Sequence, residues 1–464
     1  MVGPDYKRPE MNVPKHYNES QSLPNGVAEE AWWLAFNDKV LSNLIRRGSS
    51  QNLDIQSAYA RIRSARAEKQ HTIATGLPSL GARGALSQRA NLFVNGENAD
   101  NPISGGYFGD SLLNIAQEGL SVQWEIDPAG GLFRRIERAE AEIDAKSYDQ
   151  RAILVSLQGE IARSYMELRA NEEKLALTKE AVKRFGETYE LLKVRANAGL
   201  DNWEAVSQQK QLLNTTKSII PPIEKAIKQQ IHQLSVLLGL YPGDLTYLSS
   251  SGSVIPTPND QVTIDLPADL IRRRPDVVAS ESLLAAASAD QGAAMALQYP
   301  KINLSSFIGA QNTQLASLIP MGKAWSYGGG ISTPIFNWGR IQADIDRANA
   351  NYDAHFFEYK KTLLTAYQEV EDYLVDYRKE REKLSKTIEA VDASQDAMEI
   401  SNERYFLGLT PFVSLLQNQA DNYKQKLLLI ENRKGISTSV VGLYKALGGG
   451  WKFNEKSNQP SNSH

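Results

Sequence analysis

The stretch Arg404–Tyr405–Phe406–Leu407–Gly408–Leu409 joins two long helical segments and decides the fold. Upstream of it no proline interrupts the chain from Gly339 to Glu403, and apolar residues recur at three- and four-residue spacing. A helix of about 65 residues, rising about 1.5 Å per residue, is on the order of 100 Å long. This length exceeds that of helices in globular proteins and predicts a coiled coil or a helical tube.

The same turn occurs earlier in the chain, at Arg195–Leu200, again between two long helical segments. In both turns a glycine follows the arginine by four positions and a leucine follows the glycine. Helix, two strands, long helix, hairpin and helix occur in the same order in both halves of the chain. Because this period exceeds about 200 residues, it predicts a duplicated fold rather than a short-repeat solenoid.

The expected segments follow from these patterns. Residues 1–30, rich in proline, form an extended arm. The first repeat, 31–256, contains a helix, strands 78–94 and 111–127, a long helix 130–198 and a helix 201–240. The second repeat, 257–451, contains a helix, strands 300–312 and 324–336, a long helix 339–407 and a helix 410–447. Residues 452–464 form a polar, disordered tail.

Two features are expected to interrupt the predicted helices and strands, a proline pair and two irregular segments. Pro221–Pro222 lies inside the predicted helix 201–240 and is expected to break or kink it, because each proline removes a ladder hydrogen bond. Residues 91–110, rich in Gly, Asn and Asp, are expected to form a long exposed loop, and residues 241–266 a linker.

The strand segments favour a membrane location only in part. From Leu120 to Ile126 every second residue is apolar and the others are polar. Each strand has about 12 to 16 residues, and a tilted strand needs about 9 to 11 to cross a bilayer. Aromatic residues lie at or near the strand ends, as in the interfacial belts of membrane proteins, namely Tyr299, Phe336, Trp338, Tyr107, Phe108 and Phe133. A soluble sandwich with one hydrated face fits the periodicity equally well.

Closure of the sheet limits the membrane alternative. In lipid every strand edge must be paired, so a sheet that spans a bilayer has to close. Four strands are too few, because the smallest barrels have about eight. If the sheet is transmembrane, several chains must each contribute four strands, and three chains would give twelve strands around a polar lumen.

Composition excludes several function classes. The 464 residues carry a net charge of −3 and no cysteine, so we expect no nucleic-acid partner, no disulfide and no thiolate chemistry. No run of about 18 apolar residues occurs, so no transmembrane helix is predicted. The start at Met1–Val2–Gly3–Pro4, without a signal peptide, is read as a mature or trimmed N-terminus.

An enzyme and a periplasmic coiled-coil scaffold are the competing function classes. The five histidines have no metal-ligand spacing, and Glu369 and Glu371 point in different directions on one helix. Neither a phosphate-binding glycine loop nor a nucleophile elbow is present. We therefore expect no catalytic residue, metal or cofactor. A scaffold would leave membranes in high salt, whereas a barrel would need detergent.

Several motifs resemble the TolC/OprM-like outer-membrane factors, the exit ducts of Gram-negative tripartite efflux pumps. They cover nearly the whole chain in the order expected for that family. They are Gly3–Pro9 (GPDYKRP), Leu270–Val277 (LIRRRPDV), Pro334–Arg340 (PIFNWGR), the two Arg-x-x-x-Gly-Leu turns and Leu447–Trp451 (LGGGW).

The resemblance implies a mixed α and β membrane protein that forms a homotrimer. Four transmembrane strands per chain would complete a twelve-stranded β-barrel in the outer membrane, continued by a twelve-helix periplasmic α-barrel. Such a duct catalyses nothing and releases drugs or other toxic small molecules that an inner-membrane RND-type pump delivers through a periplasmic adaptor. Heavy-metal efflux and type I secretion stay open as alternatives, because a wide duct does not reveal its substrate.

The resemblance also concerns the N-terminus. Many members carry a lipidated cysteine just before a segment like Gly3–Pro4–Asp5–Tyr6. This chain contains no cysteine, so either the residue has been removed or replaced or this member lacks the anchor.

In the family the two turns form the periplasmic tip that meets the adaptor. Six residues are therefore our adaptor-contact candidates: Arg195, Gly199, Leu200, Arg404, Gly408 and Leu409. A glycine in each turn suits the positive φ that such a helix end requires. Plain helix caps are the alternative interpretation.

The expected gate departs from the family pattern. Family members often carry aspartates after the second hairpin, where this chain has Thr410, Ser414 and Gln417. The other gate candidates are Tyr405, which keeps an aromatic found in TolC, Glu204 as a carboxylate near the first hairpin, and Asp421. Three copies of Asp421 would form an acidic ring that attracts cations, and a solvated surface position is the alternative.

Overall fold

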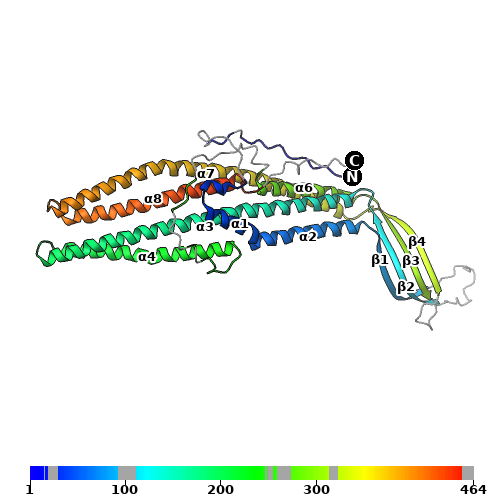
Figure 1. Cartoon of the computed structure of the whole chain (residues 1–464). Helices are drawn as coiled ribbons and strands as arrows, with labels where there is room; N and C mark the ends of the chain where they lie inside the picture. The colour runs from blue at the N-terminus through cyan, green and yellow to red at the C-terminus, as the bar shows by residue number, and fades with distance from the viewer. Residues whose placement is uncertain are drawn as a thin grey trace, which may run out of the picture. The chain divides into compact units, whose positions relative to one another are not determined.

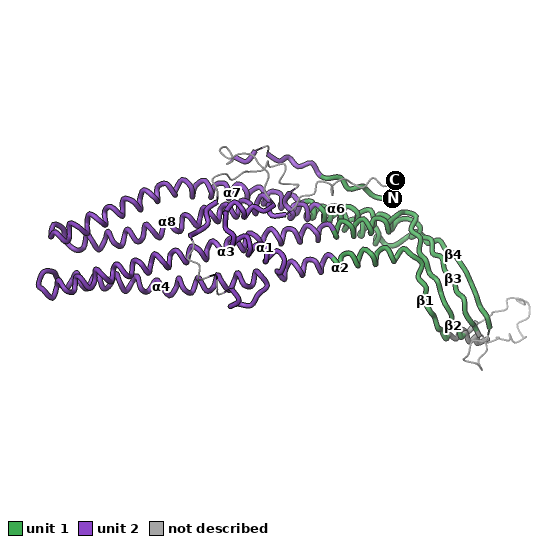
Figure 2. Tube along the Cα trace, in the orientation of Figure 1, with its two compact units in different colours: residues 1–8, 63–143, 282–356 green, residues 9–62, 144–281, 357–464 purple. Residues whose placement is uncertain are grey.

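The computed structural model describes residues 1–14, 16–18, 30–91, 111–245, 248, 254–258, 273–312 and 322–451. The predicted loop after Asn91, most of the predicted linker and the tail lie outside the described residues. The chain forms two compact units, which we call unit 1 (residues 1–8, 63–143 and 282–356) and unit 2 (residues 9–62, 144–281 and 357–464) (Figure 2).

Unit 1 contains one antiparallel sheet of four strands in the order β1-β2-β3-β4 (Figure 1). The strands are β1 (Ser79–Asn91), β2 (Ser111–Ile126), β3 (Lys301–Asn312) and β4 (Gly322–Ser332). The predicted last strand, 324–336, is wrong at its end, because β4 stops at Ser332. Pro334 follows two residues later, and a proline has no N–H to donate to a sheet.

The two faces of this sheet differ in polarity. Cross-strand partners share a face, so Leu120 lies beside Ile308, which in turn lies beside Trp325. This face is apolar along most of its described length. The other face carries Ser121, Gln123, Ser305, Ser326 and Gly328, and Phe307 is its only aromatic residue within the described strands. The predicted alternation is therefore present in the folded sheet.

A glycine pair marks a close approach of β2 and β3 at the middle of the sheet. Gly119 lies opposite Gly309, and a Cβ on either residue would come within 2.7 Å of the partner's Cα. The ring of Phe307 lies across both glycines, 2.8 Å from each of those Cβ positions. An aromatic ring over strand glycines replaces the side-chain packing that glycine lacks.

The long helices repeat with a constant offset. α3 (Gly131–Asn197) and α7 (Arg340–Phe406) each have 67 residues, and α4 (Trp203–Leu237) and α8 (Phe412–Ala446) each have 35. The second member of each pair starts 209 residues after the first (131 to 340, and 203 to 412). The predicted ranges 130–198 and 339–407 enclose α3 and α7, and the duplication inferred from the turns is present in the fold.

The shorter helices are η1 (Trp32–Phe36, a 3-10 helix), α1 (Lys39–Gln51), α2 (Leu53–Thr75) and α6 (Pro275–Ala296). Asp38 caps α1, because its carboxylate accepts hydrogen bonds from the backbone N–H groups of Val40 and Leu41.

Of the predicted break or kink at Pro221–Pro222, the break is wrong, because α4 continues through both prolines, and the kink stays a prediction. They free the carbonyl groups of Lys217 and Ser218 from the helical ladder. Both prolines are exposed, and Lys217 and Ser218 lie on the same outer part of the helix, so water can satisfy the carbonyl groups.

Two of the sequence motifs meet in unit 2. Arg274 is almost buried and pairs with Asp276 and Glu369, each at 2.6 Å, and donates to the carbonyl oxygen of Ala446 at 3.1 Å. Trp451 donates from its indole nitrogen to the carbonyl oxygen of Arg273. The Arg-Arg-Pro-Asp and Gly-Gly-Gly-Trp motifs therefore fasten the end of α8 to the start of α6.

The N-terminal arm is fastened in each unit. In unit 1 the buried guanidinium of Arg134 donates to the carbonyl oxygens of Val2 and Gly3 and pairs with Asp5 at 2.8 Å. In unit 2 the ring of Tyr17 stacks on Tyr367 with centroids 5.2 Å apart. The described part of the arm is therefore held by contacts with other parts of the chain.

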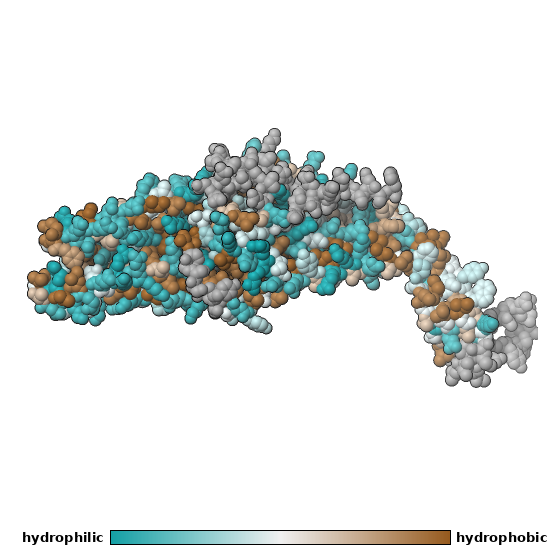
Figure 3. Space-filling model, in the orientation of Figure 1, coloured by the Kyte–Doolittle hydropathy of each residue, from teal (hydrophilic) through white to brown (hydrophobic). Residues whose placement is uncertain are grey.

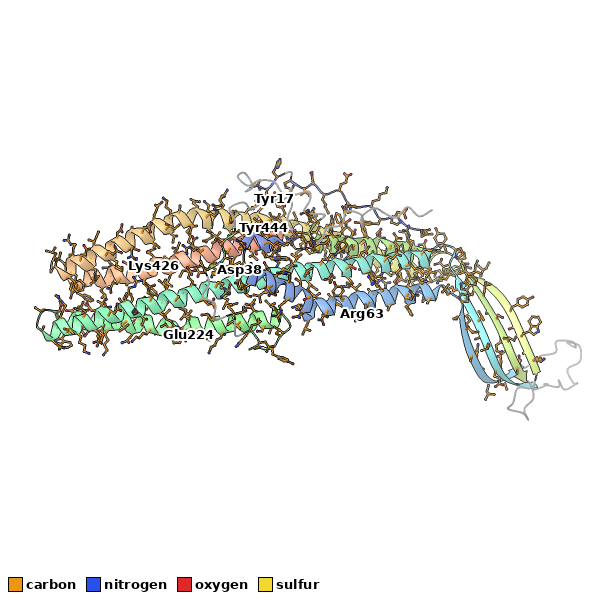
Figure 4. The ribbon with its side chains drawn as sticks, viewed as in Figure 1. Tyr17, Asp38, Arg63, Glu224, Lys426 and Tyr444 are labelled. Carbon is orange, nitrogen blue, oxygen red and sulfur yellow. The ribbon has the colours of Figure 1, made fainter. Side chains whose placement is uncertain are left out.

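A buried ion pair holds the middle of α3. Arg169 and Glu172 pair at 2.6 Å, and the Arg169 guanidinium lies over the ring of Tyr165. The Tyr165 hydroxyl donates to the carboxylate of Asp38 at 2.8 Å, which ties the start of α1 to α3. Asp38 is labelled in Figure 4. Burial raises the pKa of Glu172, and Arg169 opposes that shift.

Replacing Arg169 by methionine is expected to lower the free energy of unfolding by about 3 kcal/mol, because Glu172 loses its buried partner. The pKa of Glu172 then rises further, and a raised carboxyl pKa favours the folded state at low pH and loses that contribution as pH rises. The deficit should therefore be smaller at pH 5 than at pH 7 in thermal unfolding. Adding Glu172→Gln should remove this pH dependence, and a deficit independent of pH in Arg169→Met alone would contradict the assignment.

Candidate functional site at the helical hairpins

The two hairpins of unit 2 have the same backbone geometry. Leu200 N–H donates to the carbonyl oxygen of Arg195, and Leu409 N–H donates to that of Arg404, both at 2.9 Å. Gly199 and Gly408 have φ of 71° and 72°, and each donates to the carbonyl oxygen three residues before it. This is the Schellman motif, in which the glycine takes a left-handed conformation that other residues adopt at a cost. The glycines predicted to serve the turn do so in both hairpins.

The side chains of the two hairpins differ. Arg195 pairs with Asp201 at 2.5 Å, and Asp201 raises the pKa of that guanidinium. At the corresponding positions of the second hairpin stand Arg404 and Thr410. Arg404 is exposed and makes no ion pair among the described residues. The first hairpin is therefore neutralised within itself, and the second presents a free positive charge.

Tyr405 connects the two hairpins. It is buried in a cluster of residues from both, with Leu192, Ala196, Val206 and Leu415 among its members. The Arg195 guanidinium lies 5.8 Å from the centroid of the Tyr405 ring and 5.9 Å from that of Phe406. Burial, together with the nearby Asp201 carboxylate, raises the pKa of Tyr405 to about 12, so its hydroxyl stays protonated at physiological pH.

The predicted gate residues differ in their burial. Tyr405 and Thr410 both have buried hydroxyl oxygens without a hydrogen-bond partner among the described residues. Gln417 and Asp421 are exposed on α8, and Ser414 is half-buried there. Glu204 is exposed at the start of α4, where its carboxylate accepts from Gln208.

Asp201 is the residue that the sequence reasoning missed. It lies next to Arg195 and Tyr405, where Glu204 was expected to supply the carboxylate. The available signal was its place directly after Gly199–Leu200, six positions from Arg195. The second turn has Thr410 at the corresponding position, so the repeat itself does not mark Asp201.

A cavity of about 330 Å³ lies beside this cluster, between α3, α7 and α8. Phe185 and Tyr423 line it edge to face, with ring centroids 6.4 Å apart. Lys426 of α8, labelled in Figure 4, lines the cavity and donates to Gln395 at 2.9 Å. Burial, helped by the charge of Arg184, lowers the pKa of Lys426.

Apolar side chains are exposed at both hairpin ends, as the brown surface in Figure 3 shows. Leu200 and Trp203 are exposed on the first hairpin, and Leu407, Leu409 and Val413 on the second. Exposed apolar patches of this kind mark contact surfaces for other proteins.

Within the described ranges, no three His, Asp or Glu side chains converge as a metal ion would require. Across the same residues, no helix is long and apolar enough to cross a bilayer.

Comparison with known proteins identifies the family. The model of the family described as outer membrane efflux protein matches residues 44–240 and 266–449, which is most of the chain. The chain belongs to the outer membrane efflux protein family.

Individual members resemble this outer membrane efflux protein over nearly its full length. It is 30% identical to the toluene efflux pump outer membrane protein TtgC of Pseudomonas putida, over 97% of this chain and 92% of that protein. It is 31% identical to nodulation protein T of Rhizobium leguminosarum bv. trifolii, over 90% and 88%. The solved structure of the outer-membrane channel OprN superposes with a TM-score of 0.87 at 28% identity, over 97% of this chain and 99% of that one.

Membership of this family assigns the outer membrane efflux protein its role. It has the fold of the outer-membrane efflux channels, and it is a passive exit duct in the outer membrane that catalyses no reaction. The prediction of a non-enzymatic exit duct is confirmed, and so is the resemblance drawn from the motifs.

Proposed function

We propose that three copies of this chain form the duct of a tripartite efflux system. Their sheets close into a twelve-stranded β-barrel in the outer membrane, and their long helices form a periplasmic tube of twelve helices. The sheet carries this proposal, because it has one apolar and one polar face, and β1 and β4 lie at its edges. An unpaired edge in lipid leaves backbone groups without hydrogen bonds, so the edges of neighbouring copies must pair.

The number of chains in each detergent-purified particle tests whether the protein is a trimer. Native mass spectrometry should give three chains per particle, and the trimer should need detergent rather than high salt for extraction from membranes. A single chain per particle, or release by salt, would contradict the barrel and favour a scaffold.

The partners of this duct are a periplasmic adaptor and an inner-membrane RND-type transporter. The adaptor binds the hairpin ends, whose exposed Leu200 and Leu409 occupy the same position in two identical turns. The cargo consists of toxic small molecules, because a 30% identical relative is named a toluene efflux component. Candidate contacts are Arg195, Gly199, Leu200, Arg404, Gly408 and Leu409.

Leu200→Asp together with Leu409→Asp is expected to weaken adaptor binding at least tenfold, because burying an unpaired carboxylate costs about 1.4 kcal/mol or more. The measurement is the Kd for the adaptor encoded beside this gene, by surface plasmon resonance. Val236→Asp, also at an exposed apolar position in unit 2, is the matched control. Unchanged affinity in the double variant would remove the hairpin ends from the contact.

A lipid anchor at the N-terminus is part of the proposal for the native protein. Val2 N–H donates to the carbonyl oxygen of Ala129 at 3.2 Å, in the turn that follows β2. An acyl chain attached at this end would therefore start close to the end of a membrane strand. Intact-mass analysis of the native protein should show the added acyl mass, and an unmodified mass would exclude the anchor.

The gate of this duct lies at the hairpin ends, with Tyr405, Thr410, Ser414, Gln417, Asp421 and Glu204 as its candidate residues. Tyr405→Phe or Asp421→Ala is expected to raise single-channel conductance in planar bilayers about twofold or more, because the first removes a buried hydroxyl beside Asp201 and the second removes a charge from the proposed ring of three Asp421 carboxylates. Unchanged conductance in both variants would remove these two residues from the gate.

A further inference from the structure

The cavity of about 330 Å³ between α3, α7 and α8 lies wholly within unit 2. Its volume falls in the range of about 300–1,000 Å³ that small-molecule sites occupy. Each helix lines it with side chains at three- and four-residue spacing, as Gln419, Tyr423 and Lys426 do on α8. None of the lining residues is a candidate for the gate or for the adaptor contact. We call it the α3–α8 cavity.

The wall of the α3–α8 cavity is aromatic. Phe185 of α3 and Tyr423 of α8 meet edge to face, and Phe406 of α7 also lines the space. The Tyr423 hydroxyl is hydrogen-bonded to the Thr178 hydroxyl at 2.9 Å, which holds its ring in place. Such a wall suits a flat apolar ring, because aromatic rings pack favourably in edge-to-face and offset arrangements.

The duplicated plan of the helices does not itself require this aromatic pair. With the constant offset of 209 residues, Phe185 corresponds to Ser394 and Tyr423 corresponds to Asn214. The second copy of each position is therefore a small or polar residue within the same helix type. The aromatic pair is a feature of the α3–α8 cavity and not of the repeat.

Lys426 brings an ammonium group to this lining without a carboxylate partner. The side chain is half-buried, and among the described residues it uses one of its three N–H donors, on Gln395. Burial lowers its pKa, which means that the surrounding residues do not fully compensate the charged form. In contrast, the half-buried Lys174 and Lys434 both pair with Glu431.

The other charged side chains of the lining favour an anion beside Lys426. Arg184 already pairs with Glu180 at 2.9 Å, and its charge helps to lower the pKa of Lys426. Glu187 and Glu399 are exposed, so water solvates their carboxylates and they need no cation. The charge that lacks compensation is therefore the half-buried ammonium.

Gln419 adds an acceptor at the other end of the same stripe. It is 8% exposed, and its side-chain oxygen is buried without a hydrogen-bond partner among the described residues. A donor on a bound molecule would satisfy this oxygen. Gln419 and Lys426 are seven residues apart, about 10 Å along the helix, so the two polar groups of such a molecule lie at its opposite ends.

We propose that the α3–α8 cavity binds a small aromatic carboxylate. The ring system packs against Phe185 and Tyr423, the carboxylate pairs with Lys426, and a hydroxyl group at the far end donates to Gln419. The bound molecule bridges α3 of the first hairpin and α8 of the second. All of its contacts come from one chain, so the inference rests on neither the proposed trimer nor the proposed adaptor or gate.

Calorimetric titration of the detergent-purified full chain with 6-hydroxy-2-naphthoate tests the site. Saturable binding of one molecule per chain is expected. Lys426→Met should raise the Kd about tenfold or more, because charge-assisted hydrogen bonds are the strong ones. Lys424→Met, at an exposed lysine of the same helix outside the lining, is the matched control and should leave the Kd unchanged. The neutral 6-hydroxy-2-naphthamide should bind wild type and Lys426→Met equally.

A second variant tests the cavity without touching the ammonium. Ala181 is buried in the α3 part of the lining, and Ala181→Leu fills the space there while Lys426 stays in place. It should weaken binding of the naphthoate about tenfold or more. Wild-type affinity in Ala181→Leu would place the ligand elsewhere.

Three further results would overturn the proposal. The first is the absence of saturable binding of the naphthoate to wild type. The second is an equal Kd in Lys426→Met and Lys424→Met, which would remove the ammonium from the site. The third is tighter binding of the corresponding naphthylmethylammonium, because the exposed carboxylates of Glu187 and Glu399 would then determine the charge that the site accepts.

Discussion

Replacing Gly309 by alanine is expected to prevent the chain from assembling into a folded channel. A Cβ on Gly309 would lie 2.1 Å from the carbonyl oxygen of Glu118 and 2.7 Å from the Cα of Gly119. Backbone atoms of a paired strand cannot move away without breaking ladder hydrogen bonds. We therefore expect a loss of about 3 kcal/mol or more, with the yield of folded protein falling below about a tenth of wild type.

Gly330→Ala is the matched control for this variant. Gly330 lies on the same polar face of the sheet, and nothing approaches within 4 Å of the position a Cβ would take there. The measurement is the fraction of detergent-purified protein that migrates as a heat-modifiable oligomer on electrophoresis. Equal fractions for Gly309→Ala and Gly330→Ala would show that the close approach at the glycine pair is not required.

The long helices were predictable because their signal is repetitive. Apolar residues recur with a period near 3.6 over some 65 residues, so a few residues that break the pattern do not change the prediction of a helix. The two Gly-Leu turns indicate where the helices end. The prolines of α4 show the limit of local rules. Whether Pro221 breaks a helix depends on whether water reaches the carbonyl groups it frees, and exposure is a tertiary property.

The site was less predictable, because it consists of contacts across helices. Tyr405 was selected for its place in the second turn, but its neighbours Leu192 and Val206 come from α3 and α4. No periodicity within one helix shows such a contact. Asp201 lies only six residues from Arg195, yet both a solvated aspartate and an ion pair fit that spacing.

Asp201→Ala is expected to open the duct more than any single change at the exposed gate candidates. The carboxylate holds Arg195 at 2.5 Å, and Arg195 in turn lies over Tyr405 and Phe406. Loss of a charged hydrogen bond of about 1.5–3 kcal/mol frees this arginine and loosens the cluster between the two hairpins. The ratio of open to closed channels should rise at least tenfold in planar bilayers.

Asp392→Ala is the control for that change, because Asp392 is exposed on α7 and has no ion pair among the described residues. Its open-to-closed ratio should equal that of wild type. If Asp201→Ala also leaves the ratio unchanged, the contact between the hairpins does not hold the duct closed, and the gate lies elsewhere.

Thr410→Asp removes the difference in charge pairing between the two hairpins, because it offers Arg404 a carboxylate partner. It places a carboxylate six residues after Arg404, as Asp201 stands six residues after Arg195, and the two turns have φ values of 72° and 71° at their glycines. An ion pair with Arg404 is therefore expected, and the second hairpin would become neutral like the first. If Arg404 meets a carboxylate of the adaptor, affinity for the adaptor should fall about tenfold at low salt and less at high salt, where exposed charges are screened.

The control for this substitution is Thr410→Asn. Thr410→Asn has a similar shape without the charge and should leave adaptor affinity unchanged. Conductance separates the two proposed functions of the hairpin ends, because Thr410→Asp gives Arg404 a carboxylate partner and leaves the pair of Arg195 and Asp201 in place. A variant that loses the adaptor while its channel still closes would assign docking to the second hairpin and closure to the contact between them. Full adaptor affinity in Thr410→Asp would instead mean that the free charge of Arg404 has no part in docking.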